Sequence, residues 1–66
     1  MTVTINGESR EIPETLSVAD LVEHLGLSAG RVAVEQNREI LPREHWEERQ
    51  IAGGDSFEIV HFVGGG

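Results

Sequence analysis

Three consecutive glycines, residues 64–66, close the chain and are the residues best placed to take part in chemistry. Glycine has no Cβ and more backbone freedom than any other residue, so we expect a flexible tail that protrudes beyond the last strand. Such a tail, made of Gly64, Gly65 and Gly66, could thread a narrow channel in a partner enzyme. It would then present the carboxylate of Gly66 at a buried active site. A frayed terminus without a function is the alternative interpretation.

Other polar pairs are weaker candidates for chemistry. Asp20 and His24 are four residues apart and could share one face of a helix, but a closed metal site usually needs four ligands. His45 and Glu44 are neighbours in the sequence with no nucleophile nearby, so they form no acid–base pair. The chain has no cysteine, which excludes disulfides and thiolate chemistry. We therefore expect no metal site, no catalytic residue and no bound cofactor, and predict that the chain is not an enzyme.

The charge of the chain limits its partners. Twelve acidic residues against five basic ones give a formal net charge of −7 at pH 7. Nucleic acids and anionic membranes need a basic face, so we expect neither as a partner. A basic protein surface is the electrostatic complement, although the charge also serves solubility. No apolar run approaches the roughly 20 residues that span a bilayer, and we expect a cytoplasmic protein.

The sequence pattern in the first half of the chain predicts a β-hairpin. Residues 1–5 alternate apolar and polar side chains and are rich in β-branched residues, which favours a strand. Asn6-Gly7 then favours a tight turn, because both residues tolerate positive φ. Residues 8–12 return antiparallel, and Pro13 ends the second strand because it has no N–H for the ladder.

A short amphipathic helix is predicted after the hairpin. Ser17 is a suitable N-cap, with Asp20 three residues later to complete the cap. Gly26 is suited to the position just after the helix. The apolar stripe has the spacing i, i+3, i+4 and i+7 and comprises Val18, Leu21, Val22 and Leu25.

The second half of the chain predicts three more strands. Their alternating apolar residues lie at residues 31–36, 39–41 and 57–63. Tight turns are expected at residues 37–38 and 53–55. Residues 43–49 are polar apart from Trp46, and we expect a single helical turn or an irregular loop there. Trp46 is predicted to pack against the sheet edge, with a role in partner binding as the alternative.

This order of elements predicts an α+β fold. A mixed four- to five-stranded sheet would pack on one main helix and leave its other face partly open to water. The order and length are those of a β-grasp fold. We expect one β-grasp domain over residues 1–63 and a flexible glycine tail over residues 64–66.

The last strand carries a candidate docking patch. Strict alternation places Phe57 and Ile59 in the core, and Val60 and Phe62 on the open face beside the tail. We predict that Val60, Phe62 and Val63 form a patch that docks a partner protein. The alternatives are that Trp46 or a loop covers Val60, or that the end of the sheet is simply apolar. His61 is expected to be partly buried or to contact the partner.

Several segments together resemble the ubiquitin-like β-grasp sulfur carriers, and most closely the ThiS family of thiamine biosynthesis. The resemblance covers the whole chain, and its third glycine, Gly64, departs from the expected pattern. The segments that carry it are residues 1–7, 32–37, 40–46 and 54–55 and the glycine terminus.

The resemblance implies a function for the tail. A ThiF-like adenylating enzyme would bind the domain and consume ATP to adenylate the carboxylate of Gly66. Sulfur from a persulfide donor would replace AMP and leave a C-terminal thiocarboxylate. A ThiG-like thiazole synthase would accept that sulfur for thiamine. Related carriers serve molybdopterin synthesis, tRNA thiolation or cysteine synthesis, and these pathways remain alternatives, as does a β-grasp interaction module that carries no sulfur.

Overall fold

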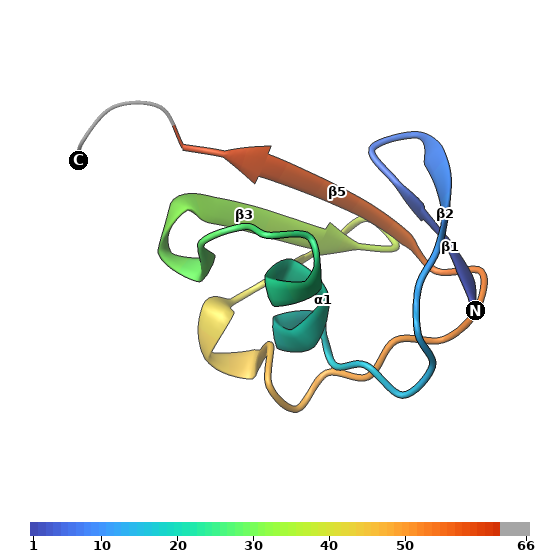
Figure 1. The fold of residues 1–66 in the computed structure, drawn as a ribbon. Helices are drawn as coiled ribbons and strands as arrows, with labels where there is room; N and C mark the ends of the chain where they lie inside the picture. The colour runs from blue at the N-terminus through green and yellow to red at the C-terminus, as the bar shows by residue number, and fades with distance from the viewer. Residues whose placement is uncertain (63–66) are drawn as a thin grey trace.

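A single mixed sheet of five strands organises the chain, with one helix packed on one side of it (Figure 1). The computed structural model describes residues 1–62. The strands lie in the spatial order β2-β1-β5-β3-β4. Their bounds are β1 Thr2–Ile5, β2 Glu8–Glu11, β3 Val32–Gln36, β4 Glu39–Leu41 and β5 Ser56–His61. The helix is α1, Val18–His24, and the short 3-10 turns are η1, Ala29–Arg31, and η2, Arg43–His45.

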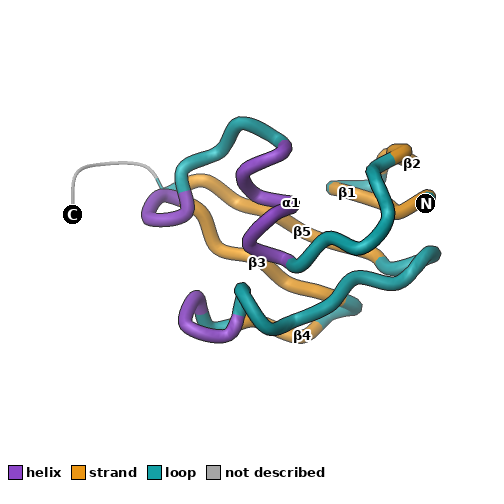
Figure 2. Tube along the Cα trace, turned by 60° about the horizontal axis from the view of Figure 1, so that its bottom comes forward, coloured by secondary structure: helices purple, strands orange, loops and turns teal. Residues whose placement is uncertain are grey.

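The arrangement confirms the predicted α+β, ubiquitin-like fold. β5 lies between β1, with which it runs parallel, and β3, with which it runs antiparallel (Figure 2). The two hairpins, β1–β2 and β3–β4, form the outer parts of the sheet. The predicted tail, residues 64–66, and the end of the predicted domain at Val63 lie outside the described residues.

Two tight turns set the registers of the hairpins. Asn6 and Gly7 have φ values of 50° and 83°, and Asn37 and Arg38 have φ values of 51° and 72°. Two consecutive residues at positive φ match the right-handed twist of the strands that they join. Asparagine tolerates this region of φ well, which is why both turns were predictable from the sequence.

Asn6 also ties the first hairpin to β5. Its side-chain Oδ1 accepts a hydrogen bond from the Ile59 N–H at 2.8 Å, and its Nδ2 donates to the Ile59 carbonyl at 3.1 Å. The amide therefore continues the pairing of β1 with β5 beyond the last residue of β1. The sequence showed Asn6 only as a turn residue.

The helix begins and ends as predicted. The Asp20 N–H donates to Ser17 Oγ at 3.1 Å, and the Ser17 N–H donates to Asp20 Oδ2 at 3.2 Å, which is a capping box. At the other end, Gly26 has a φ of 76°, and the Leu27 N–H donates to the Val22 carbonyl at 3.1 Å. This Schellman arrangement satisfies carbonyls of the last turn.

The core lies between α1 and the inner face of the sheet. Trp46 is 3% exposed, and its Nε1 donates to the Leu41 carbonyl at 3.0 Å, so it anchors η2 to the edge of the sheet as predicted. It is therefore a core residue of the free chain. The other buried apolar residues are Val3, Ile5, Ile12, Val18, Leu21, Val22, Val32, Val34, Leu41, Ile51, Phe57 and Ile59.

Three predicted details need correction. β2 ends at Glu11, and Ile12 lies beyond it as a buried residue. β5 begins at Ser56 and ends at His61, so Phe62 follows the strand. His61 is exposed, because it lies at the end of the sheet beyond the first hairpin, and the expectation of partial burial was wrong.

Candidate functional site

The end of β5 carries the chain out of the middle of the sheet. The Phe62 N–H donates to the Arg31 carbonyl at 2.8 Å, so the last described residue is still held to η1. The predicted site residues Val63, Gly64, Gly65 and Gly66 follow directly and lie outside the described residues. The structure therefore defines the surface from which the candidate tail starts.

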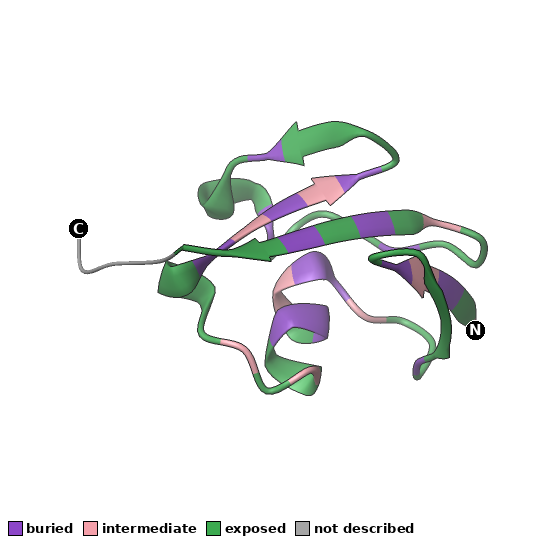
Figure 3. Ribbon diagram, turned by 90° about the horizontal axis from the view of Figure 1, so that it is seen from above, coloured by how far each residue is buried: buried purple, intermediate pink, exposed green. Residues whose placement is uncertain are grey.

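The open face of the sheet exposes apolar side chains next to that starting point. Val60 is 58% exposed and Phe62 is 62% exposed, as the alternation along β5 predicts. Figure 3 shows this alternation as successive buried and exposed bands on the strand. Because Val60 is 58% exposed, neither Trp46 nor a loop covers it, and the prediction of such coverage is wrong.

Ile40 lies on the same face, and the sequence patterns did not identify it as an exposed residue. It is 73% exposed, the highest value among the large apolar side chains of the described residues. The register pairs Ile40 with Glu35, and Glu35 with Glu58 on β5. The sequence carried a weak signal, because Leu41 points to the core and its neighbour Ile40 must then point away from it.

A pocket of about 370 Å³ opens beside Phe62. Trp46 and Leu41 contribute to its wall from the core side, and Arg43 and Glu44 contribute from η2. Phe62 therefore borders a hollow as well as an exposed apolar face, which suits an aromatic side chain that contacts a partner.

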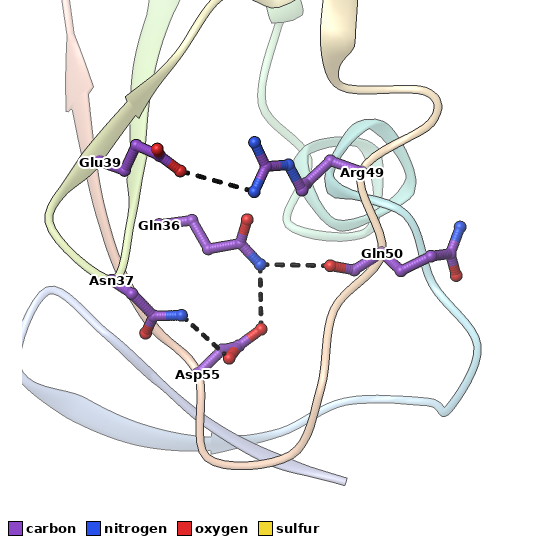
Figure 4. A network of polar contacts seen from close by, with 6 residues as sticks. All are labelled: Gln36, Asn37, Glu39, Arg49, Gln50 and Asp55. Carbon is purple, nitrogen blue, oxygen red and sulfur yellow. Dashed lines mark hydrogen bonds and ion pairs between the residues drawn. The ribbon is translucent and has the colours of Figure 1, made fainter.

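A polar network at the opposite end of β5 fixes where that strand begins (Figure 4). Asp55 accepts hydrogen bonds from Gln36 Nε2 at 2.9 Å, from Asn37 Nδ2 at 3.1 Å and from the Ala52 N–H at 2.9 Å. Gln36 Nε2 also donates to the Gln50 carbonyl at 3.2 Å. The network joins the β3–β4 turn to the loop before β5.

Burial and hydrogen bonding act in opposite directions on the Asp55 carboxyl. Burial raises its pKa, but the hydrogen bonds from the Ala52 N–H, Asn37 and Gln36 stabilise the carboxylate, and the pKa ends below its ordinary value. Asp55 is therefore a charged structural residue. The sequence indicated only a turn at this position.

The weaker candidates have structural roles in the described part of the chain. Asp20 caps α1, and His45 Nδ1 lies 2.8 Å from Glu48 Oε1 rather than beside Glu44. Residues 1–62 contain no group of three or more side chains arranged to hold a metal ion. Among these residues, no helix has the length and apolar character needed to cross a lipid bilayer.

A family model and a solved structure that resemble this chain both bear the name ThiS. The ThiS family model matches residues 3–66. The crystal structure of a thiamine biosynthesis protein (ThiS) from Geobacter metallireducens superposes with a TM-score of 0.87 at 36% identity, covering 100% of both chains.

Two curated relatives are similar in sequence. A sulfur carrier protein ThiS from Bacillus subtilis is 42% identical over 53 residues, covering 80% of each chain. A thiazole synthase from Paramagnetospirillum magneticum is 41% identical over 66 residues. That match covers 100% of this chain but spans only 20% of the length of the synthase.

Proposed function

The chain belongs to the ThiS family of sulfur carriers of thiamine biosynthesis, and we propose that Gly66 is the residue at which it carries sulfur. The observation that supports this most is the match of the family model across residues 3–66, which includes the glycines. In this proposal the chain is a protein cosubstrate in the cytoplasm rather than an enzyme. ATP is consumed by its partner, and the chain itself binds no cofactor.

The chemistry begins with activation of a poor acyl donor. A ThiF-like adenylating enzyme joins the Gly66 carboxylate to the α-phosphate of ATP and releases pyrophosphate. The terminal sulfur of a persulfide then attacks the acyl carbon and AMP leaves. A thiol cleaves the resulting S–S bond, and Gly66 keeps one sulfur as a thiocarboxylate. The absence of cysteine from the chain agrees with sulfur transport on the backbone terminus.

The acceptor in this proposal is a thiazole synthase. The relative from Paramagnetospirillum magneticum is named a thiazole synthase, and this whole chain aligns with 20% of its length at 41% identity. This relationship favours thiamine biosynthesis over molybdopterin synthesis, tRNA thiolation or cysteine synthesis. The function of Gly64 and Gly65 is to reach into the active sites of both partners without side chains.

An intact mass spectrum tests the carrier chemistry. The chain is mixed with ATP, a ThiF-like enzyme from the same host and a persulfide donor. We expect a mass gain equal to the exchange of one oxygen for one sulfur, mapped to Gly66. Omission of ATP and deletion of residues 65–66 are the controls. No gain, with the enzyme shown to be active on another carrier, would contradict the proposal and leave a plain interaction module.

The docking patch, Val60, Phe62 and Val63, is proposed to bind the adenylating enzyme. Val60→Arg places a charge on the exposed apolar surface, and we expect adenylation to fall at least about tenfold. The domain should keep its stability, because Val60 is 58% exposed. Gln50→Arg adds the same charge at an exposed loop position and serves as the matched control. Equal adenylation of the two variants would remove the patch from the proposal.

A further inference from the structure

The centre of the open face holds two acidic residues directly opposite each other. The register of β3 and β5 pairs Glu35 with Glu58 and, two residues along on the same face, Ala33 with Val60. The register of β3 and β4 places Ile40 on the other side of Glu35. A row of side chains, Ile40, Glu35 and Glu58, therefore crosses three strands on the face that also carries Val60.

No basic side chain among residues 1–62 forms an ion pair with Glu35 or Glu58. Like charges directly opposite each other on neighbouring strands destabilise a sheet, because the side chains lie close together. The ion pairs among residues 1–62 are His45 with Glu48 and Glu39 with Arg49, and they include neither Glu35 nor Glu58. Glu58 is exposed and Glu35 is half-buried, so both carboxylates can be reached from the open face.

The neighbours of the pair indicate a protein surface as the occupant. Ile40, on β4, is 73% exposed and lies beside Glu35. Val60 is 58% exposed and lies two residues from Glu58 on β5. A partner that covers these apolar side chains also removes water from the carboxylates, which strengthens their attraction for a positive charge. The net charge of −7 gives the whole domain the same electrostatic preference.

We propose that Glu35 and Glu58 together bind one arginine side chain of the adenylating partner, set among apolar residues that cover Ile40 and Val60. This inference rests on the proposed function and adds the chemistry by which the partner is recognised. A guanidinium has five N–H donors in one plane and can bind two carboxylates at once. The repulsion between Glu35 and Glu58 is then relieved only in the complex.

The test compares two double variants with the same net charge. Glu35→Gln with Glu58→Gln neutralises the pair. Glu14→Gln with Glu23→Gln neutralises two exposed carboxylates, one in the loop before α1 and one on α1. Binding of each full chain to the ThiF-like enzyme is measured by calorimetry at low and high salt, and thermal unfolding of each free chain is measured alongside.

We expect the pair variant to bind at least about tenfold more weakly, and the control variant less than about threefold more weakly. The affinity of the pair variant should also depend less on salt than that of the wild-type chain. The free pair variant should unfold at the same temperature or higher, because the repulsion between Glu35 and Glu58 is gone. Weaker binding together with undiminished stability would distinguish recognition from a structural role.

Three outcomes would overturn the inference. The two double variants could weaken binding equally, the pair variant could bind like the wild-type chain, or its loss of binding could follow a loss of stability. In each case, normal thiocarboxylate formation by the wild-type chain would leave the proposed function standing. A wild-type chain that neither binds the enzyme nor gains sulfur would contradict both.

Discussion

Asp55 shows how one side chain can set the start of a strand. Its carboxylate receives three hydrogen bonds, and the Ser56 N–H donates to Asn37 Oδ1 at 2.9 Å, so the first residue of β5 is tied to the β3–β4 turn. β5 is the strand that leads to the candidate reactive end. The placement of that end therefore depends on a residue at the other end of the strand.

The lowered pKa of Asp55 predicts a dependence of stability on pH. A carboxyl with a lower pKa in the folded state contributes stability above its unfolded pKa of about 4, and loses it as pH falls through the folded value. Asp55→Asn should lower the free energy of unfolding by about 1–3 kcal/mol at neutral pH, with a smaller difference from the wild type in acid. Urea unfolding between about pH 7 and about pH 2 measures this. Glu47→Gln removes a carboxylate at an exposed position and is the control.

Single residues also mark the limit of prediction from sequence. The patterns identified Trp46, Phe57 and Ile59 as packing residues, because apolar alternation reports which face is buried. They could not show that the amide of Asn6 binds the backbone of Ile59, since these residues are 53 positions apart. Contacts of this kind depend on the finished arrangement of the strands.

At the scale of elements, the turns and the helix were the most predictable parts. Asn6-Gly7, Asn37-Arg38 and the Ser17 cap act over a few residues, so local sequence determines them. The ends of β2 and β5 were less predictable, because they depend on where a neighbouring strand stops pairing. Ile40 was missed for a related reason, since a three-residue strand gives little alternation to read.

The short helix gives an element-scale prediction. α1 has only seven residues, so its caps contribute a large share of its local stability. Ser17→Ala removes the hydrogen bond that the Asp20 N–H donates to the Ser17 hydroxyl and keeps the backbone N–H that donates to Asp20. It should lower the free energy of unfolding by about 1 kcal/mol. Ser28→Ala is the matched control, because Ser28 precedes η1 but makes no side-chain cap hydrogen bond. Chemical denaturation should separate the two variants, and equal losses would contradict the role of the cap.

At the scale of the whole molecule, the two faces of the sheet have separate tasks. The inner face and α1 bury the core, and the outer face presents Ile40, Val60 and the acidic pair. The sequence predicted this division and the family from short segments spread along the chain. It did not predict the row of Ile40, Glu35 and Glu58, because that row exists only once three strands are in register.

This division predicts that activity can be lost without loss of the fold. Gly65→Ala adds a Cβ to a tail that is proposed to fill a narrow channel, and thiocarboxylate formation should fall at least about hundredfold. The midpoint of unfolding should not change. Gly53→Ala is the matched control, because its Cβ would meet Met1 Cβ at 3.8 Å, an ordinary contact. Activation of the Gly65 variant at the wild-type rate would contradict the proposed path of the tail.

The central place of β5 also has a mechanical consequence. Its hydrogen bonds to β1 and β3 run across the strand, and the Asn6 amide adds a further clamp at Ile59. A force applied along β5 from its C-terminal end would load these bonds in shear, all at the same time, instead of peeling them apart in sequence. An unfolding protein that pulls on the end proposed to carry sulfur would therefore have to break the pairing of β5 with both neighbouring strands.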